Sequence, residues 1–593
     1  MPKQLRVIAR RHWRRLLRLR ERVQISDEAI HLGLAAIVGL CGGLINLAFY
    51  RGTRLAMGLT LHHQGDPVEV ASMLPHWQRV VATGVGGLLA GLVLAFGLRF
   101  AGRQGTNFLE AVAVGDGRLS FRAGMVKAFS SLCSIVSGGS IGREGAITQL
   151  SAMCASQIGQ GAKSPPYRLR LLVACGAAAG IAAPYNAPIG GAVFAAMIVL
   201  GNFSMTTFAP LVTASAVSCV VSRGFFGMDP LYDVPDFPFM HILDLPWFLI
   251  LGALAGLLGA FFMQALHASE RLFRRIPAPL YVRMMLGGLL VGIIAIEFPE
   301  VWGNGYLAAN RILQDHYVFA LLAGLFFAKL AATLLTVGSG AVGGVFTPTL
   351  FLGTALGSLC GMTLHHIGLA ESMPNGAFAL VGMSSVLAAT TQSPLLAVIM
   401  VFEISLDYSL MPAVMLGCGM SSVVARRLHP RSIYAETERL QEVVAGRETD
   451  RTGVATEQTV GDVMREPVPP LRMEDPLRTV AKRFLSSSNN FLPVIDEGYR
   501  LVGMVALQDL KEFLDPDQEL QVVIAYDVMR PPPPVLFAHQ RLAEVLSMVL
   551  ASELRNIPVV SSREEMELVG SVSRAELLAL YADAIGRAGS IRL

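Results

Sequence analysis

The chain contains 593 residues, of which 53% are hydrophobic and only 16% are charged. This composition excludes a disordered chain, a collagen-like chain and an ordinary soluble protein, so lipid must solvate a large part of the molecule. The formal net charge of +4 is small for this length and gives no reason to expect a nucleic-acid partner.

The first residues form a strongly basic segment. Nine Lys and Arg residues precede Gln24, and the first apolar run, residues 30–50, is long enough to cross a bilayer. No small-residue cleavage site follows that run, which argues against a signal peptide. We therefore predict that residues 1–28 form a basic helix held on the cytoplasmic face of the membrane.

Apolar runs then follow one another through a predicted membrane domain of residues 29–445. Several runs are shorter than the roughly 20 residues that a full span needs, and many contain Gly or Pro. Short, broken helices are tolerated at membrane depth only where they enclose a cavity, and in transporters they mark the binding site. The runs are residues 30–50, 80–100, 125–136, 171–183, 187–200, 208–221, 247–266, 284–296, 318–337, 351–363, 387–404 and 410–424.

A weak internal repeat relates the two halves of this domain. The glycine-rich stretch 138–146 has the same character as 340–348, and an apolar helix is expected after each. Further along, Asn-Ala-Pro at 186–188 and Gln-Ser-Pro at 392–394 each begin another apolar helix. Two halves with matching break points predict an inverted-repeat transporter.

The C-terminal quarter has a different composition, because residues 446–593 hold 22 of the 44 acidic residues. Three short motifs recur there, in the same order and at nearly constant spacing. Residues 462–465 recur at 527–530, 491–495 at 556–560, and 501–505 at 568–572. The pattern of a helix, two β-branched strands and a closing helix resembles a tandem pair of CBS domains, a Bateman module. We expect a linker at 446–458 and α/β CBS domains at 459–515 and 524–585.

Glu144 is the most informative residue of the membrane domain. It lies between Gly142-Arg143 and Gly145, and an apolar stretch follows. An ionised carboxylate at membrane depth costs at least about 2.5 kcal/mol, so it needs partners or a proton. A helix that begins here offers unpaired N–H groups, where Glu144 would compete with an anion. The simpler alternative is an acidic residue that caps this helix.

The second glycine-rich break offers backbone groups instead of a charge. Gly344 permits a close approach of the backbone, and Pro348 suits the first turn of a helix. The N–H groups of Val345 and Phe346 are therefore expected to point into the same cavity as Glu144.

These residues together resemble the CLC family of chloride channels and chloride/proton exchangers. The resemblance lies in Gly-Arg-Glu-Gly at 142–145, Gly-Val-Phe-Thr-Pro at 344–348 and Ser-Ile-Tyr at 432–434. Lys127 and the sequence Phe-Glu-Ile at 402–404 also match family positions. The resemblance covers the chain from about residue 30. It implies a mainly α-helical polytopic fold with an inverted repeat of broken, tilted helices, and a homodimer with one anion pathway in each subunit.

The resemblance also implies roles for single residues. Glu144 would be the gate and proton acceptor, and the Tyr434 hydroxyl would be an inner anion donor. The other anion-binding positions would be Gln104, Gly105, Thr106, Gly142, Arg143, Gly145, Val345 and Phe346.

The sequence departs from the family pattern at three places. The first family motif, Gly-Ser-Gly-Ile-Pro, is replaced by residues 103–107, so its serine and proline are missing and Gln104 or Thr106 would have to donate instead. Ala146 replaces a proline after Glu144, which leaves the helix start intact. Residues 194–199 contain no acid where exchangers usually have an internal proton-transfer glutamate.

In the CBS pair, Asp509 resembles the acidic position that holds a nucleotide ribose, and Glu576 is its counterpart in the second domain. An adenine nucleotide is the one cofactor that this resemblance suggests. The alternative is that both acids simply cap helices. The seven cysteines lie in apolar stretches without a Cys-X-X-Cys pair, so they predict neither a metal site nor a redox site.

We therefore predict transport of chloride or a similar small anion, gated by Glu144 and passive or weakly coupled to protons. The alternatives are a coupled chloride/proton antiporter and a CBS-linked divalent-cation transporter, although a cation site needs more carboxylates than this membrane domain has. No nucleophile–base pair or metal-ligand spacing suggests an enzyme. The protein should lie in the cell (inner) membrane among lipid, as a multi-pass protein with both termini in the cytoplasm.

Overall fold

The computed structural model describes residues 27–101, 107–113, 115–201, 203, 205–227, 232–235, 237, 244–370, 372–434, 459–487, 489–510, 523–552, 554–574 and 577. The chain divides into two compact units, residues 1–440 and 441–593. The predicted basic helix at 1–28 falls almost entirely outside the described residues, and the predicted linker at 446–458 falls wholly outside them.

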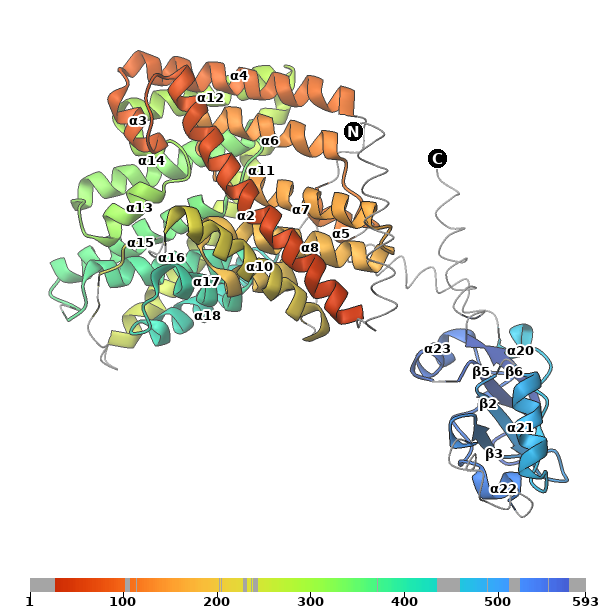
Figure 1. Ribbon diagram of the computed structural model, residues 1–593. Helices are drawn as coiled ribbons and strands as arrows, with labels where there is room; N and C mark the ends of the chain where they lie inside the picture. The colour runs from red at the N-terminus through yellow and green to blue at the C-terminus, as the bar shows by residue number, and fades with distance from the viewer. Residues whose placement is uncertain are drawn as a thin grey trace. The chain divides into compact units, whose positions relative to one another are not determined.

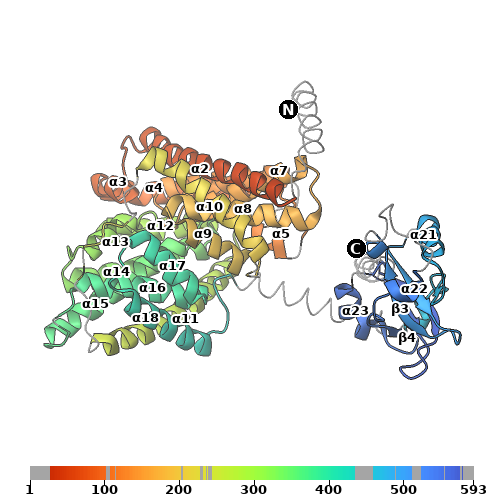
Figure 2. The ribbon, with the colours of Figure 1, turned by 60° about the horizontal axis from the view of Figure 1, so that its bottom comes forward.

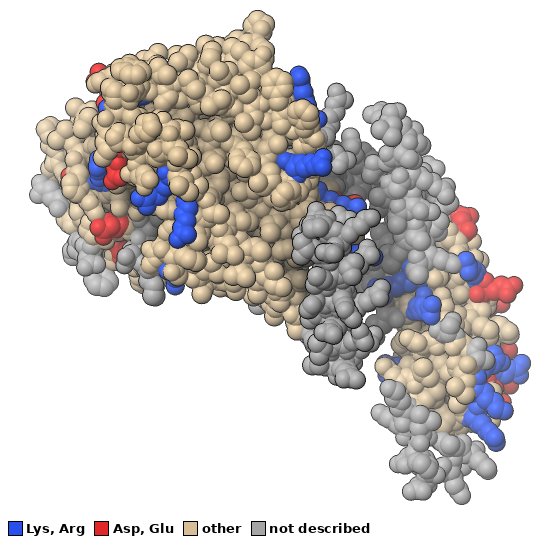
Figure 3. All heavy atoms as spheres, turned by 45° about the horizontal axis from the view of Figure 1, so that its top comes forward, with Lys and Arg blue, Asp and Glu red and all other residues tan. Residues whose placement is uncertain are grey.

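The described part of the first unit is helical (Figures 1 and 2). Seven of its helices, α2, α4, α10, α11, α12, α14 and α15, are long and apolar enough to cross a membrane. The face of this unit seen in Figure 3 carries few charged side chains, as a lipid-facing surface requires.

The helices of the two halves of this unit correspond in order. The first half contains α2 (Asp27–Thr60), α3 (Pro67–Met73), α4 (His76–Ala101), α5 (Phe108–Ala113), α6 (Phe121–Val136), α7 (Glu144–Gly161), α8 (Pro166–Tyr185), α9 (Pro188–Phe194), the π-helix η1 (Ala195–Val199) and α10 (Met205–Phe226). The second half contains α11 (Leu245–Arg275), α12 (Leu280–Glu297), the 3₁₀ helix η3 (Pro299–Val301), α13 (Tyr306–Leu313), α14 (Phe319–Gly338), α15 (Phe346–His366), α16 (Asn375–Thr391), α17 (Pro394–Ser405) and α18 (Met411–Leu428).

Equivalent breaks in the two halves have nearly the same backbone geometry. Helix α8 ends at Asn186 with φ 55°, ψ 31°, and α16 ends at Gln392 with φ 53°, ψ 26°. A proline then starts the next helix in each half, since its fixed φ suits the first turn. The helix start predicted at 392–394 is confirmed, because the left-handed Gln392 ends α16 and Pro394 begins α17 inside the apolar run 387–404.

Glycines pack the repeated helices in the same way. A Cβ atom at Gly39 or Gly43 of α2 would meet the backbone oxygens of Ala214 and Ser218 in α10. A Cβ atom at Gly252 or Gly256 of α11 would meet the backbone oxygens of Gly417 and Ser421 in α18. The repeat therefore makes the α11–α18 pair the counterpart of the α2–α10 pair, and it supports the predicted inverted-repeat fold.

The second unit contains two copies of one α/β motif. In each copy two strands pair in parallel and the second also pairs antiparallel with the third, in the orders β1-β2-β3 and β4-β5-β6. Two of the three predicted repeats correspond to strands β2 and β3 and to β5 and β6, and the third, at 462–465 and 527–530, falls at the ends of α20 and α22. The elements are α20 (Val460–Val463), β1 (Leu471–Arg472), α21 (Leu477–Ser486), β2 (Phe491–Ile495), β3 (Leu501–Ala506), α22 (Ala525–Val528), β4 (Leu536–Phe537), α23 (Leu542–Ala551), β5 (Asn556–Val560) and β6 (Leu568–Ser573).

Candidate functional site

The two glycine-rich breaks of the membrane unit meet each other at the centre of the repeat. Gly142 N–H donates to the Gly344 carbonyl oxygen over 2.7 Å, and Gly344 N–H donates back to Gly142 over 2.9 Å. Each break contains a left-handed glycine, Gly138 with φ 94° and Gly340 with φ 105°, which a residue with a Cβ atom would adopt only under strain. This antiparallel bridge brings the starts of α7 and α15 together.

Glu144 is the first residue of α7, and its side chain reaches the other repeat. The side chain is buried, with 2% of the residue exposed, and its Oε1 accepts a hydrogen bond of 3.0 Å from Thr347 N–H. Thr347 belongs to the first turn of α15, where N–H groups have no intrahelical acceptor and carry partial positive charge. The carboxylate of Glu144 therefore occupies an anion position at a helix N-terminus.

Glycine is required around this carboxylate for a steric reason. A Cβ atom at Gly344 would lie 2.6 Å from Glu144 Oε1, within the space that the side chain fills. A Cβ atom at Gly145 would lie 2.7 Å from the backbone nitrogen of Gly344. The first clash involves a side chain that can move, whereas the second involves a backbone fixed by the bridge.

A cavity of about 370 Å³ begins beside Glu144, and we name it the Tyr434 cavity after the tyrosine in its wall. The residues around it that bear on its chemistry are Asn107, Lys127, Glu144, Gly145, Val345, Phe346 and Tyr434. Most of these residues were singled out in the sequence, and they come from separate stretches of the chain. The fold therefore brings distant motifs into the wall of one cavity.

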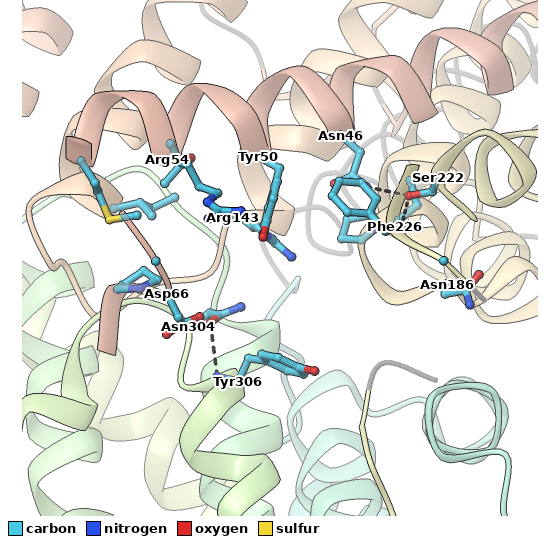
Figure 4. Close-up of a pocket in the computed structure, with 18 of the residues that line it drawn as sticks. Asn46, Tyr50, Arg54, Asp66, Arg143, Asn186, Ser222, Phe226, Asn304 and Tyr306 are labelled. Atoms are coloured by element: carbon cyan, nitrogen blue, oxygen red, sulfur yellow. Dashed lines mark hydrogen bonds between the residues drawn. The ribbon is translucent and has the colours of Figure 1, made fainter. Parts of the chain in front are cut away.

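A second cavity, of about 380 Å³, is named the Arg143 cavity (Figure 4). The Arg143 guanidinium carbon lies 5.2 Å from the centre of the Tyr50 ring, and that of Arg54 lies 5.9 Å from the same ring. Arg223 also lines this cavity, and its Nε donates to Asn186 Oδ1 over 2.6 Å. Arg143 lines this cavity and the next residue, Glu144, lines the Tyr434 cavity, so Glu144 lies between a cavity with three arginines and a cavity with one lysine, Lys127.

Asp66 is the one acidic residue among those that line the Arg143 cavity. Its carboxylate accepts a hydrogen bond of 3.0 Å from Val68 N–H and caps α3. Burial raises the pKa of the Asp66 carboxyl above its usual range, while the Val68 hydrogen bond and the charge of Arg143 act in the opposite direction. The three arginines therefore outnumber the acid in this cavity.

The predicted anion-binding residues fall into three groups. Gly145, Val345, Phe346 and Tyr434 line the Tyr434 cavity together with Glu144. Arg143 lines the other cavity instead, and Gly142 forms the bridge between the two breaks. Gln104, Gly105 and Thr106 lie outside the described residues, although Asn107, which follows them, lines the Tyr434 cavity.

Sequence reasoning missed two residues that hold the helix start at α15. It did not identify Thr347 as the donor to Glu144, because the two residues belong to different halves of the chain. It also missed Tyr185, whose hydroxyl forms a 2.7 Å hydrogen bond with Thr347 Oγ1. The position of Tyr185, next to the break at Asn186, was the signal that could have pointed to it.

Lys329 in α14 was also missed. It is fully buried, and its Nζ donates to the carbonyl oxygens of Val301 and Gly303, over 2.9 Å each. These two hydrogen bonds fix the segment that leads to Tyr306. Tyr306 itself lines the Arg143 cavity. Lys329 precedes Gly340 by the same number of residues as Lys127 precedes Gly138, so the repeat places one lysine before each break. That equal spacing was the available signal.

Glu403 has a structural partner in the repeat. Its carboxylate accepts hydrogen bonds from Ile189 N–H over 2.9 Å and Gly190 N–H over 2.6 Å, so it caps α9. At the equivalent place in the other half, Ser393 Oγ, before α17, donates to Met197 Sδ over 3.3 Å. A methionine therefore stands where the other half has an acid.

In the second unit, Asp509 has a partner within the chain. Its Oδ2 accepts a 2.7 Å hydrogen bond from Arg530 Nε, and its Oδ1 accepts another from the same guanidinium. Arg530 therefore occupies two of the acceptor positions of Asp509, and a ribose would share this carboxylate with Arg530 or displace it. Glu576, the predicted counterpart, lies outside the described residues.

Comparison with protein families fits both units. A family model described as voltage gated chloride channel matches residues 85–426, and the CBS domain model matches residues 460–516 and 525–583. The chain belongs to the CLC, or voltage-gated chloride channel, family. This CLC protein also carries a CBS pair, so the predicted family and domain types are confirmed.

Relatives match the membrane unit over nearly their whole length. A putative chloride channel protein described as ClcB-like, from Ralstonia nicotianae, is 42% identical over 409 residues, which is 68% of this chain and 95% of the relative. The voltage-gated ClC-type chloride channel ClcB of Escherichia coli O9:H4 is 36% identical over 413 residues, which is 68% of this chain and 97% of the relative.

Solved structures support the fold. A slow cyanobacterial Cl⁻/H⁺ antiporter aligns with a TM-score of 0.62 at 23% identity, covering 70% of this chain and 99% of that chain. A eukaryotic CLC transporter aligns with a TM-score of 0.57 at 18% identity, covering 93% of this chain and 98% of that chain. These alignments confirm the predicted membrane fold class.

Proposed function

We propose that this CLC protein carries chloride, or a similar small inorganic anion, across the membrane along a path that Glu144 closes. The observation that carries the proposal is the place of the Glu144 carboxylate. It accepts a hydrogen bond from the Thr347 N–H at the start of α15, and it lies between a cavity with three arginines and a cavity with Lys127 in its wall. The family of the chain and the names of its relatives support chloride as the anion.

Anion selectivity follows from the groups that line the path. The starts of α7 and α15 face each other and contribute N–H groups without intrahelical acceptors. Lys127 adds positive charge on one side, and Arg143 and Arg54 add it on the other. A partly dehydrated anion is stabilised by such donors, whereas a cation would be repelled.

Glu144 acts as the gate because its carboxylate and the anion compete for one position. While ionised, it occupies the N–H donor of Thr347 and repels chloride. Protonation removes the charge and weakens the hydrogen bond, because charge-assisted hydrogen bonds are roughly twice as strong as neutral ones. The side chain can then leave, and an anion can pass.

Transport is passive or only weakly coupled to protons. Among the residues that line the Tyr434 cavity, Glu144 is the one carboxylic acid. Met197 stands at the position that the repeat equates with Glu403, and its thioether carries no proton. Protons from the Tyr434 side would need water to reach Glu144. The alternative is coupled chloride/proton exchange, the activity named for the cyanobacterial antiporter of similar fold.

The protein works as a homodimer in the cell (inner) membrane, with the Tyr434 cavity open to the cytoplasm and the Arg143 cavity open to the outside. The CBS pair regulates transport, and an adenine nucleotide would act there by competing with Arg530 for the Asp509 carboxylate. We propose no catalytic activity. The divalent-cation alternative has little support, because the described residues contain no group of three or more possible metal ligands.

The test of this proposal is ion efflux from liposomes that contain the purified protein. A potassium ionophore lets K⁺ leave together with chloride, so that no membrane potential builds up against the efflux. Liposomes that contain the protein should then release their chloride, and liposomes without protein should retain it. Magnesium efflux, followed with an indicator dye in a parallel sample, should match the empty liposomes. Magnesium release without chloride release would refute the proposal.

Tyr434→Phe should weaken chloride binding only modestly. One hydroxyl donor is lost, which amounts to about 1 kcal/mol, or roughly a fivefold rise in the chloride dissociation constant. Isothermal titration of chloride into detergent-solubilised protein measures this. The control is Tyr408→Phe, because that tyrosine is 76% exposed and lines neither cavity. An unchanged constant in Tyr434→Phe would remove Tyr434 from the anion site.

Both ends of the chain should be protected from protease added outside intact cells. Arg426, Arg427 and Arg431 lie at or just after the end of the last membrane helix, and positive residues favour the cytoplasmic side. Tags on the two termini, detected by immunoblotting, report cleavage. Both tags should remain on full-length protein until the cells are lysed. Loss of the C-terminal tag from intact cells would reverse the proposed orientation.

A further inference from the structure

A third cavity of about 470 Å³ lies away from the anion path, between the end of α11 and the segment after α18. We name it the His267 cavity after one of its residues. Gln264, His267, Arg271 and Arg274 contribute from α11, three or four residues apart, so they form one stripe along the helix. Opposite them, His429 and Arg431 follow the last turn of α18.

The internal repeat relates the α11 wall of this cavity to the α2 wall of the Arg143 cavity. Gly39 of α2 and Gly252 of α11 are equivalent positions. A Cβ atom at Gly39 would meet α10, and a Cβ atom at Gly252 would meet α18, the counterpart of α10. Counting onward by equal numbers of residues leads from Gly39 to Arg54 and from Gly252 to His267. The repeat therefore places Arg54 in the wall of the Arg143 cavity and His267 in the wall of this one at equivalent positions.

The charge of the His267 cavity favours an anion. Three arginines line it against a single acid, Glu270, whose carboxylate lies 4.0 Å from the Arg274 guanidinium. That contact is an exposed pair within one helix and leaves most of the positive charge unbalanced. The rings of His267 and His429 are stacked with centroids 5.9 Å apart, and both residues line this cavity.

The wall of the cavity is held in place by hydrogen bonds. The carbonyl oxygen of His429 accepts a 2.8 Å bond from Gln392 Nε2, and the Gln392 carbonyl accepts a 2.8 Å bond from Arg426. The His429 ring is fixed by a 2.9 Å contact between Nδ1 and the Arg431 carbonyl oxygen. These bonds fix the His429 side of the cavity, and a wall that is already ordered lowers the cost of binding a ligand.

We propose that the His267 cavity binds a phosphate group. Planar guanidinium groups match the oxygens of phosphate in pairs, and three of them line this one cavity. The volume is far larger than a chloride ion needs and suits a phosphate together with the group that carries it. The phosphate belongs either to a soluble compound or to a lipid headgroup, because the cavity lies at the end of a helix long enough to span a membrane.

The test uses the full-length protein in a neutral detergent with two probes. Radiolabelled pyrophosphate in equilibrium dialysis represents a soluble phosphate, and phosphatidic acid retained in native mass spectrometry represents a headgroup. The variant is Arg271→Gln with Arg431→Gln, and Arg274→Gln is an independent second variant. Arg275→Gln is the matched control, because Arg275 belongs to the same helical turn but does not line the cavity.

Wild-type protein should bind at least one probe, and the double variant should bind it at least about tenfold more weakly, since charge-assisted bonds are lost. Arg275→Gln should stay within about twofold of wild type, as expected for a surface charge outside the site. Binding of pyrophosphate alone would assign a soluble phosphate, and binding of phosphatidic acid alone would assign a lipid headgroup. Failure of wild type to bind either probe would overturn the proposal. Equal losses in the double variant and in Arg275→Gln would also overturn it, because general surface charge would then explain the binding.

Discussion

Glu144→Gln is expected to remove most of the pH dependence of chloride efflux. In the wild type, efflux should rise as the pH falls, because protonation neutralises the carboxylate that occupies the Thr347 N–H. Glutamine is neutral at every pH, so the variant should be fast throughout and should resemble the wild type at low pH. Glu144→Ala, which removes the side chain, should be at least as fast. Initial efflux rates from liposomes between about pH 3.5 and 8 measure this, a range that includes the usual pKa of a glutamate carboxyl, about 4.3.

The matched control for this prediction is Glu403→Gln. Glu403 is another carboxylate of the membrane unit that accepts backbone N–H bonds, but it caps α9 and lines neither the Tyr434 cavity nor the Arg143 cavity. Its variant should keep the wild-type pH profile, once each profile is normalised to its own maximum. If Glu144→Gln and Glu144→Ala both keep the wild-type pH dependence, Glu144 is a structural residue and the proposed gate is wrong.

Alanine at two neighbouring glycines is expected to have opposite effects. The new Cβ atom of Gly344→Ala would meet the movable Glu144 side chain first, so it should push the carboxylate away from Thr347 and raise efflux at neutral pH. The new Cβ atom of Gly145→Ala would meet the backbone of Gly344 at 2.7 Å. Overpacking of this kind costs about 1–3 kcal/mol, so this variant should lose thermal stability and transport.

Efflux rates and melting temperatures of the purified variants test this pair. Gly419→Ala is the control, because its Cβ atom would have no neighbour within 4 Å. In a Glu144→Ala background, Gly344→Ala should add nothing further, since the side chain that it displaces is already absent. An additive gain in the double variant, or equal effects of Gly344→Ala and Gly145→Ala, would contradict the steric account.

Local signals in the sequence predicted the parts of the site that depend on neighbouring residues. The glycine-rich stretches before α7 and α15 each lead into an apolar run, so both helix starts were foreseeable. The strands of the CBS pair were foreseeable for a similar reason, because β2 and β5 carry the same short motif.

Contacts between distant residues were not foreseeable. The hydrogen bond from Thr347 to Glu144 joins the two halves of the membrane unit, and the Arg530–Asp509 pair joins the two CBS domains. Asp66 was passed over because its charge becomes relevant only when α3 lies beside Arg143. A single sequence holds no local trace of such pairings.

Hydropathy misplaced one helix end. The run at 30–50 stops where Arg51 introduces charge, yet α2 continues to Thr60, because Arg54 faces the polar Arg143 cavity instead of lipid. The end of α16 was foreseeable, because Gln-Ser-Pro at 392–394 interrupts the apolar run 387–404 and a proline begins α17. Apolar character indicates contact with lipid or with the protein core, but it does not show where a helix ends.

Chloride is proposed to move along the Glu144 path without stoichiometric proton exchange. The most direct test is the reversal potential of the current through the purified protein in a planar bilayer, with a chloride gradient and an imposed pH gradient. A tenfold chloride gradient alone should give a reversal potential of about 59 mV. We predict that this potential stays near the chloride equilibrium value when the pH gradient is added or reversed. A steep shift with the pH gradient would contradict the account and assign coupled chloride/proton exchange instead.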